Sequence, residues 1–199
     1  MRRLLAYAAV FALGALVLRV AVVPAEVCPP LSPGQARTAI AEAAGWLERG
    51  LQPDGRYTYG YDREADLVSS DYNITRHAGV MMGLYSLAAA TGDEQALAAA
   101  EHGLPFLRRN LLRHDDWIAF AEPGQDARLG ASALVAAALV QRRLATGDES
   151  EDELLRGLAG FLRAQQQADG SGLGAWSRES ELAVPGEWST FGTGQTLWT

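Results

Sequence analysis

The feature that most constrains the fold of this chain is a repeat with a period of 55 residues. The tetrapeptide TGDE occurs at Thr91–Glu94 and again at Thr146–Glu149. The tripeptide Phe106–Arg108 recurs with the same offset at Phe161–Arg163, and Trp46 marks an earlier unit where the later ones have phenylalanine. A period of this size is typical of an array of helical hairpins.

Each repeat predicts one fully buried helix followed by a one-sided helix. Ala78–Ala90 and Ala131–Val140 are apolar around their whole circumference, and a helix of this kind must be buried on all sides. Gln95–Leu112 and Glu149–Gln166 are amphipathic, with polar residues on one side only. The alternation predicts an inner layer of helices wrapped by an outer layer.

The turns between these helices carry end signals. Gly92 and Gly147 stand where a helix ends in the left-handed conformation. Asp93 and Asp148 suit the N-caps of the helices that follow, and Glu151 completes a capping box with Asp148.

We therefore predict an all-α fold that is an incomplete (α/α) toroid over residues 36–199. Alanine and leucine dominate, β-branched residues are sparse after residue 30, and 199 residues suffice for one domain with its own core. Only two inner–outer pairs follow the leading helix, and FGTGQTLWT begins a third inner helix. The chain is expected to be a fragment of a longer ring, or to self-associate across its open inner face.

The N-terminus predicts an export signal or a membrane anchor over residues 1–25. Arg2 and Arg3 precede an apolar run that ends in small residues, with a plausible cleavage site after Ala25. The run from Leu4 to Val23 also has about the ~20 residues that cross a bilayer, and Arg19 is close enough to its end to snorkel. Residues 26–35 are predicted to be a linker. Both alternatives place the remaining chain at the cell envelope, with the membrane as a partner.

Charge and cysteine content exclude other functions. The net charge of −7 argues against nucleic acid as a partner, because phosphate binding needs a basic surface. The single cysteine, Cys28, cannot form an intramolecular disulfide, and Val27 before it argues against lipid attachment. No His/Cys/Asp set has zinc spacing. No metal and no cofactor are expected.

A long loop precedes each predicted inner helix, at residues 56–76, 115–129 and 171–191. These loops hold nine of the sixteen aromatic residues, which a helical core does not need and which suit a binding surface. In a layered array the three loops fall at the same end. The predicted substrate-binding residues are Tyr57, Tyr59, Tyr61, Asn73, Trp117, Trp176 and Trp188.

The polar cluster before Ala78 predicts chemistry suited to sugars. Asp71 or Asn73 can cap the first inner helix, which puts Arg76 and His77 in its first turn. Carboxyl groups, tyrosine and histidine can exchange protons beside a uronate, and arginine can clamp its carboxylate. The predicted catalytic residues are Asp71, Tyr72, Arg76, His77 and Glu122.

Simpler roles stay open for the same residues. Asp71 and Asn73 can be helix caps alone, and His77 can donate to a backbone carbonyl. Tyr57, Tyr59 and Tyr61 alternate with small residues, so they can form a strand with one aromatic face that packs on the neighbouring turn.

The segment RGLAGFLRAQQQADGS, Arg156–Ser171, resembles the QW motif of terpenoid-cyclase and prenyltransferase toroids, although Gly172 stands where the motif has tryptophan. The TGDE turns resemble those of six-hairpin glycosidases and epimerases. The resemblance covers residues 36–199. It implies a toroid of carbohydrate metabolism and, if the protein is an enzyme, a glycan hydrolase, lyase or epimerase.

The resemblance leaves two other functions open. One is a terpenoid-cyclase-like enzyme on a lipid, but Arg113 stands where the acid cluster of squalene-type cyclases has a further aspartate before Asp115-Asp116. The other is a non-catalytic binding or assembly module.

Overall fold

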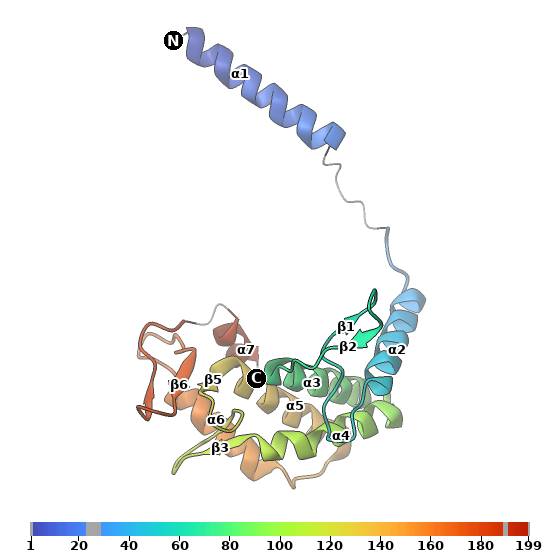
Figure 1. The fold of residues 1–199 in the computed structure, drawn as a ribbon, viewed down its shortest axis with the longest axis vertical. Helices are drawn as coiled ribbons and strands as arrows, with labels where there is room; N and C mark the ends of the chain where they lie inside the picture. Colours follow the sequence, from blue (N-terminus) through green and yellow to red (C-terminus); the bar gives the residue numbers. More distant parts are fainter. Residues whose placement is uncertain (1, 23–28, 189–190, 199) are drawn as a thin grey trace. The chain divides into compact units, whose positions relative to one another are not determined.

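The computed structural model describes residues 2–22, 29–188 and 191–198. The chain divides into two units, residues 1–39 and 40–199, which we describe separately. In the first unit, α1 (Arg2–Val17) continues into a π-helical turn, η1 (Leu18–Val22) (Figure 1). Its apolar stretch Arg3–Ala21 is long enough to cross a membrane and is exposed throughout, as a signal or an anchor requires. Ala25, Val27 and Cys28 lie outside the described residues.

The helix α2 (Pro33–Arg49) begins inside the predicted linker. Ser32 and Gln35 form a reciprocal cap, because the Gln35 N–H donates to the Ser32 hydroxyl and the Ser32 N–H donates to the Gln35 side-chain oxygen. Pro33 occupies the first helical position, where its missing N–H costs nothing. These local capping residues determine where α2 begins.

The second unit is built from α3 (Ile74–Thr91), α4 (Glu94–Arg109), α5 (Leu129–Thr146), α6 (Asp152–Ala164) and α7 (Gly192–Trp198). The most extensive helix–helix contact is between α3 and α5. Helix α4 packs on α3, while α6 and α7 pack on α5 (Figure 1). The predicted alternation of inner and outer helices is confirmed at this level. The toroid itself is not established by these packed helices and stays a prediction.

Most of the predicted helix ends are confirmed. The side chain of Asn73 accepts from the Arg76 N–H at 3.1 Å, and Asp93 caps α4. Gly92 and Gly147 adopt the left-handed conformation, with φ of 72° and 70°. The expected capping box at Asp148 is wrong.

The start of α6 lies at Asp152 because Asp148 has other partners. Its carboxylate accepts from Ser150 and forms an ion pair with Arg142, which is itself buried. This arrangement holds the turn after α5 in a compact form and delays the helix by three residues.

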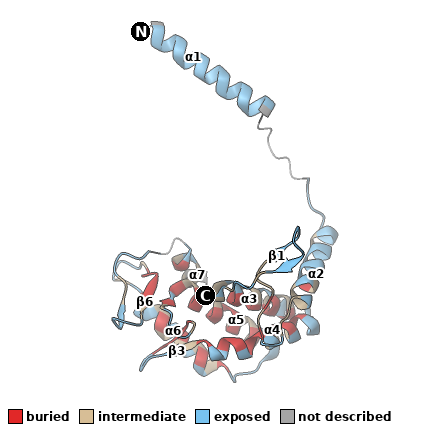
Figure 2. Cartoon of the chain, in the orientation of Figure 1, coloured by how far each residue is buried: buried red, intermediate tan, exposed pale blue. Residues whose placement is uncertain are grey.

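The core lies between the inner and outer helices (Figure 2). Met81, Leu84 and Tyr85 of α3 and Val135 and Leu139 of α5 are buried. The predicted burial of α3 on all sides is wrong, however. One side of α3 carries small and aliphatic residues that stay partly exposed, including Gly79, Val80, Gly83 and Leu87.

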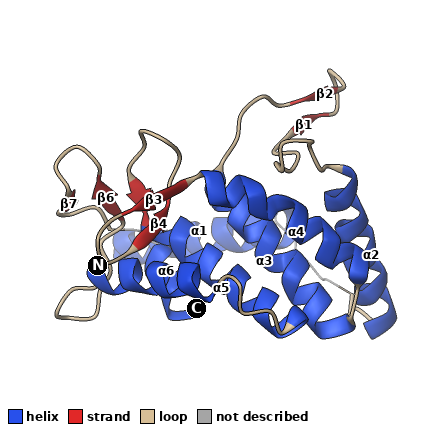
Figure 3. Cartoon of the chain, turned by 90° about the horizontal axis from the view of Figure 1, so that it is seen from below, coloured by secondary structure: helices blue, strands red, loops and turns tan. Residues whose placement is uncertain are grey.

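The three long loops are not purely irregular, which corrects the all-α prediction (Figure 3). They contain short antiparallel strands, and the end of the predicted helix Gln95–Leu112 is also extended, because α4 ends at Arg109 and a strand follows it. The strands are β1 (Tyr61–Asp62) with β2 (Leu67–Val68), β3 (Leu111–Arg113) with β4 (Ile118–Phe120), and the sheet of β5 (Ala127–Arg128), β6 (Ala175–Ser177) and β7 (Leu182–Ala183).

These pairings bring the loops together, as predicted. Strand β5 of the second loop pairs with β6 of the third. Thr75, in the first turn of α3, lines one cavity together with Arg128 and Trp188. The three connecting segments therefore meet at the N-terminal ends of α3 and α5.

Candidate functional site

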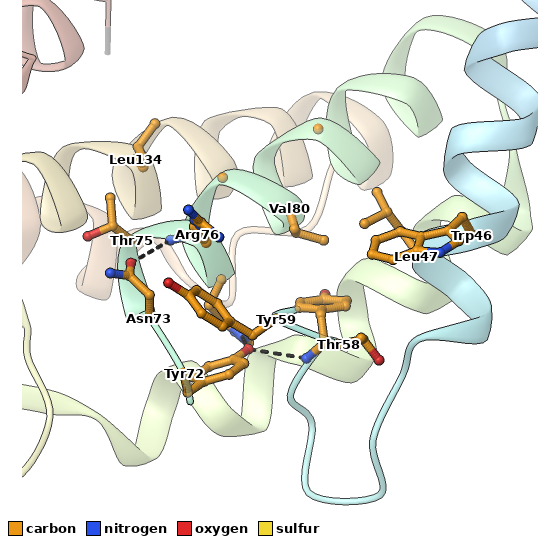
Figure 4. A pocket seen from close by; sticks show the side chains of 14 residues that line it. Trp46, Leu47, Thr58, Tyr59, Tyr72, Asn73, Thr75, Arg76, Val80 and Leu134 are labelled. Atoms are coloured by element: carbon orange, nitrogen blue, oxygen red, sulfur yellow. Dashed lines mark hydrogen bonds between the residues drawn. The ribbon is translucent and has the colours of Figure 1, made fainter. Parts of the chain in front are cut away.

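A cavity of about 560 Å³ lies at the start of α3, within the size range of small-molecule sites. The loop before α3 supplies three tyrosines, α2 supplies Trp46 and Leu47, and α5 supplies Leu134 (Figure 4). The remaining lining comes from Thr58 of the same loop, from α3 and from the residue that caps α3. The predicted site residues in the lining are Tyr57, Tyr59, Tyr72, Asn73, Arg76 and His77.

The rim of the cavity carries a cation on an aromatic ring. The guanidinium carbon of Arg76 lies 4.6 Å from the centre of the Tyr59 ring, within range of a cation–π interaction. Arg76 is exposed, and no carboxylate forms an ion pair with it among the described residues. Its donors are therefore available to an anionic group.

Behind the rim, hydrogen bonds link Tyr72 and His77. The Tyr72 hydroxyl lies 2.7 Å from His77 Nδ1, and His77 Nε2 lies 3.2 Å from the Gly103 carbonyl oxygen. The Tyr57 N–H donates to the Tyr72 hydroxyl at 3.1 Å. Because the Gly103 carbonyl can only accept, Nε2 carries the proton and Nδ1 accepts from Tyr72.

Burial sets the protonation of these groups. It lowers the pKa of His77 to about 4, against the smaller opposing effect of the hydrogen bond to Gly103. Burial also raises the pKa of Tyr72 to about 12 and raises that of Tyr57 still further. At neutral pH both Tyr72 and His77 are therefore uncharged, which suits a fixed hydrogen-bonding network.

Two predicted residues near the cavity do not line it. Asp71 is exposed, and its N–H donates to the Ser69 hydroxyl. The hydroxyl of Tyr61 donates to Asp66, and the Tyr61 ring is half exposed on the β1–β2 hairpin. Glu122, also predicted to be catalytic, is half-buried after β4 and does not line the cavity.

The tryptophans of the second and third loops pack on each other. The rings of Trp117 and Trp176 are 5.0 Å apart and nearly perpendicular, and both are buried around Phe161. Gly160 of α6 lets the second loop approach closely, since a Cβ there would lie 2.9 Å from the Asp116 carbonyl oxygen and 3.2 Å from the Trp117 Cβ. The prediction that Trp117 and Trp176 bind substrate at a surface is wrong, because their rings are buried in a small core. Trp188, by contrast, is exposed and lines a second cavity.

Sequence reasoning missed the residues that shape the floor of the first cavity. Gly79 and Gly83 lie one turn apart on α3, and a Cβ added at either would meet nothing within 4 Å. The spacing of these glycines within an otherwise apolar helix was the available signal, since it leaves one helix face bare. In the sequence, Trp46 marks only the repeat, and no local signal places it or Leu47 at a cavity.

No metal centre accompanies this site in the part of the chain that the structure describes. There, no three His, Cys, Asp or Glu side chains are grouped so as to hold an ion. The described lining of the cavity offers aromatic faces, the exposed Arg76 guanidinium, the Asn73 amide, threonine hydroxyls and the neutral Tyr72–His77 pair.

Comparison with known proteins gives a structural likeness only. No protein-family model matches the chain, and no curated protein matches it. Among solved structures it is similar to a sugar epimerase from a ruminal bacterium, with a TM-score of 0.61 and 16% sequence identity. The match covers 75% of this chain and 42% of the epimerase chain, so this chain spans less than half of that length. The fold is therefore sugar-epimerase-like.

Proposed function

We propose that the chain is an exported or membrane-anchored protein of carbohydrate metabolism that binds a uronate-type glycan in the cavity at the start of α3. The sugar-epimerase-like fold supports the coarse part of this proposal, and the apolar helix Arg3–Ala21 supports export or anchoring. The observation that supports a uronate as the ligand is the exposed guanidinium of Arg76, which lies over the Tyr59 ring at the rim.

The cavity lining suits a sugar ring. The half-buried rings of Tyr59 and Tyr72 and the half-exposed ring of Trp46 offer faces on which the C–H groups of a pyranose can stack. Asn73 lines the same cavity and adds amide donors for hydroxyl groups. A lining of this kind holds the ring by contact area and orients it with few polar groups.

Arg76 supplies the selectivity for an acidic sugar. A guanidinium can donate two parallel hydrogen bonds to a carboxylate, and Arg76 has no competing carboxylate among the described residues. The ring of Tyr59 holds the guanidinium without neutralising it. A uronate is therefore favoured over the corresponding neutral sugar.

If the site is catalytic, Tyr72 is the residue placed to exchange a proton with the bound sugar. Its hydroxyl has His77 Nδ1 as a proton acceptor 2.7 Å away. Transfer of the phenol proton to the imidazole is unfavourable at rest, because burial raises the pKa of Tyr72 and lowers that of His77. The neutral phenol is thus the resting form, and its oxygen can take a C–H proton from the sugar only as its own proton passes to His77 Nδ1.

A non-catalytic binding module is the second candidate. Among the described residues no Asp or Glu lines the first cavity, and both ring nitrogens of His77 are already hydrogen-bonded. The carboxyl pair that glycoside hydrolysis uses is therefore missing from this lining. No observation favours the lipid-cyclizing alternative.

Calorimetric titration of the full-length chain in detergent micelles tests the binding proposal. We expect oligouronates to bind and the corresponding neutral oligosaccharides to bind about two- to fivefold more weakly, since an ion pair at an exposed arginine is worth up to about 1 kcal/mol. Arg76→Gln should abolish this preference. Arg113→Gln, an exposed arginine that does not line the cavity, is the matched control. Equal binding of acidic and neutral glycans would overturn the proposal.

A proton-exchange experiment distinguishes an enzyme from a non-catalytic binding module. Incubation of a bound oligouronate in deuterated water, followed by proton NMR of the sugar, detects abstraction of a C–H proton beside the carboxylate. Deuterium incorporation that is lost in Tyr72→Phe indicates an enzyme, whereas binding without incorporation or cleavage indicates a binding module.

A further inference from the structure

A second cavity adjoins the first at the loop end of the helices. It has a volume of about 410 Å³, and Thr75 lines both cavities. Arg128 and Gly130, at the start of α5, form one side of it. Glu187 and Trp188, from the third loop, form another. Because one residue belongs to both walls, a chain-like ligand can pass from one cavity to the other over Thr75.

The aromatic wall of the second cavity is held in place by the backbone around it. The Trp188 side chain is 59% exposed, yet residue 188 forms a β-bridge with Leu173, and the Gly174 N–H donates to the Glu187 carbonyl at 2.6 Å. An exposed tryptophan on a fixed backbone is a platform for the apolar face of a sugar ring.

The two cavities differ in charge. Arg128 Nη1 lies 2.6 Å from a carboxylate oxygen of Glu187, so the cation of the second cavity already has a counter-ion. Both side chains are about half exposed, so their remaining donors and acceptors reach solvent. Arg76, on the other side of Thr75, lies over the Tyr59 ring and has no carboxylate partner among the residues that the structure describes.

From this contrast we infer that the second cavity is a subsite for a neutral sugar joined to the uronate in the first cavity, so that the ligand is an acidic glycan in which a uronate neighbours a neutral sugar. This inference rests on the proposed function. In the second cavity Glu187 accepts from sugar hydroxyls, Arg128 donates to them, and the Trp188 ring stacks on the sugar face. A second uronate there would meet the Glu187 carboxylate and would have to compete with it for Arg128.

Titration of the full-length chain with ligands of defined composition tests the subsite. The probes are a uronate monosaccharide, a mixed uronate–neutral disaccharide in both linkage orders, an all-uronate disaccharide and an all-neutral disaccharide. We expect one mixed disaccharide to bind at least about tenfold more tightly than the monosaccharide, the order commonly lost when a stacking ring is removed. The all-uronate disaccharide should bind no more tightly than the monosaccharide.

Two variants assign that gain to the second cavity. Trp188→Ala should reduce the affinity for the mixed disaccharide to that of the monosaccharide, and circular dichroism shows whether the variant is folded. Trp188→Phe, which keeps an aromatic face, should retain most of the gain.

Removal of the Glu187 charge tests the preference of the second cavity for a neutral sugar. Glu187→Gln frees Arg128 from its counter-ion, so this variant should bind the all-uronate disaccharide more tightly than the wild-type chain does. Glu179→Gln is the matched control, since Glu179 is an exposed carboxylate of the same loop that lines neither cavity.

The outcomes separate the two proposals. If neither the uronate monosaccharide nor any disaccharide binds, the proposed function fails. If the monosaccharide binds but a second sugar adds nothing and Trp188→Ala has no effect, the subsite is overturned while the proposed function stands. An all-uronate disaccharide that gains as much as the mixed one overturns the preference for a neutral neighbour.

Discussion

The Tyr72 hydroxyl and Nδ1 of His77 lie 2.7 Å apart, and this contact joins the loop before α3 to the first turn of that helix. On its other side, His77 contacts the Gly103 carbonyl of α4. His77 is 1% exposed, so it connects loop, inner helix and outer helix within the core. The polar cluster at the start of an apolar helix is therefore part of the wall of the cavity, whatever chemistry occurs there.

Removal of the Tyr72 hydroxyl should destabilise the chain. Tyr72→Phe leaves the Tyr57 N–H and His77 Nδ1 without a partner, and unfolding in urea should show a loss of about 1–3 kcal/mol, the usual cost of unpaired buried polar groups. Tyr59→Phe is the control, because its hydroxyl has no hydrogen bond among those described, and it should change stability by less than about 0.5 kcal/mol. Equal effects of the two variants would refute the role of this hydrogen bond.

The same histidine should make stability depend on pH. Its pKa is about 4 in the folded chain, against 6.5 when it is solvated. The folded state therefore binds the proton less tightly, so the stability contributed by neutral His77 is complete above pH 6.5. It is lost as pH falls to 4, by about 3 kcal/mol in total.

Unfolding free energies measured at intervals between pH 7 and pH 4 check this dependence, with His77→Gln as the comparison. Glutamine does not titrate, so the slope over this range should largely disappear. A slope that is the same in both proteins would show that His77 is not its source.

Two helical glycines should respond in opposite ways to alanine. A Cβ at Gly103 would collide with the Tyr57 hydroxyl, which donates to the Ala99 carbonyl at 3.0 Å, so Gly103→Ala should cost about 1–3 kcal/mol through overpacking. A Cβ at Gly83 meets nothing, so Gly83→Ala should stabilise the free chain by up to about 1 kcal/mol through helix propensity. Thermal unfolding of both variants measures the two signs. Two changes of the same sign would contradict the packing described for Tyr57.

The helices and most of their ends could be predicted because local signals specify them. Asn73, Gly92, Asp93 and Gly147 act through their own backbone neighbours, and such effects are visible in a short window of sequence. The capping box predicted at Asp148 is wrong because the carboxylate of Asp148 pairs with Arg142 of the preceding helix. A contact of that kind competes with the helix cap and cannot be recognised from the sequence of the turn alone.

The site could be predicted only in part, for the same reason. Tyr57, Tyr59, Tyr72, Arg76 and His77 are close in sequence, and the first turn of α3 gathers them. Trp117 and Trp176 were expected on a surface because they lie in loops. They are buried because the helix α6 exposes glycine where the second loop packs, and this depends on tertiary contact.

The N-terminal helix should deliver the second unit across a membrane, either as a cleaved signal or as an anchor. The stretch Arg3–Ala21 is apolar and follows a positively charged start. Alkaline phosphatase, which is active only after export, should therefore be active when fused to the C-terminus. Phe11→Arg places a charge in the middle of this stretch, at a cost of about 2.5–3.5 kcal/mol for insertion, and should reduce the activity strongly. Arg63→Gln, an exposed change in the second unit, should leave it unchanged. An inactive wild-type fusion would exclude export, and the intact mass of an active one decides between signal and anchor.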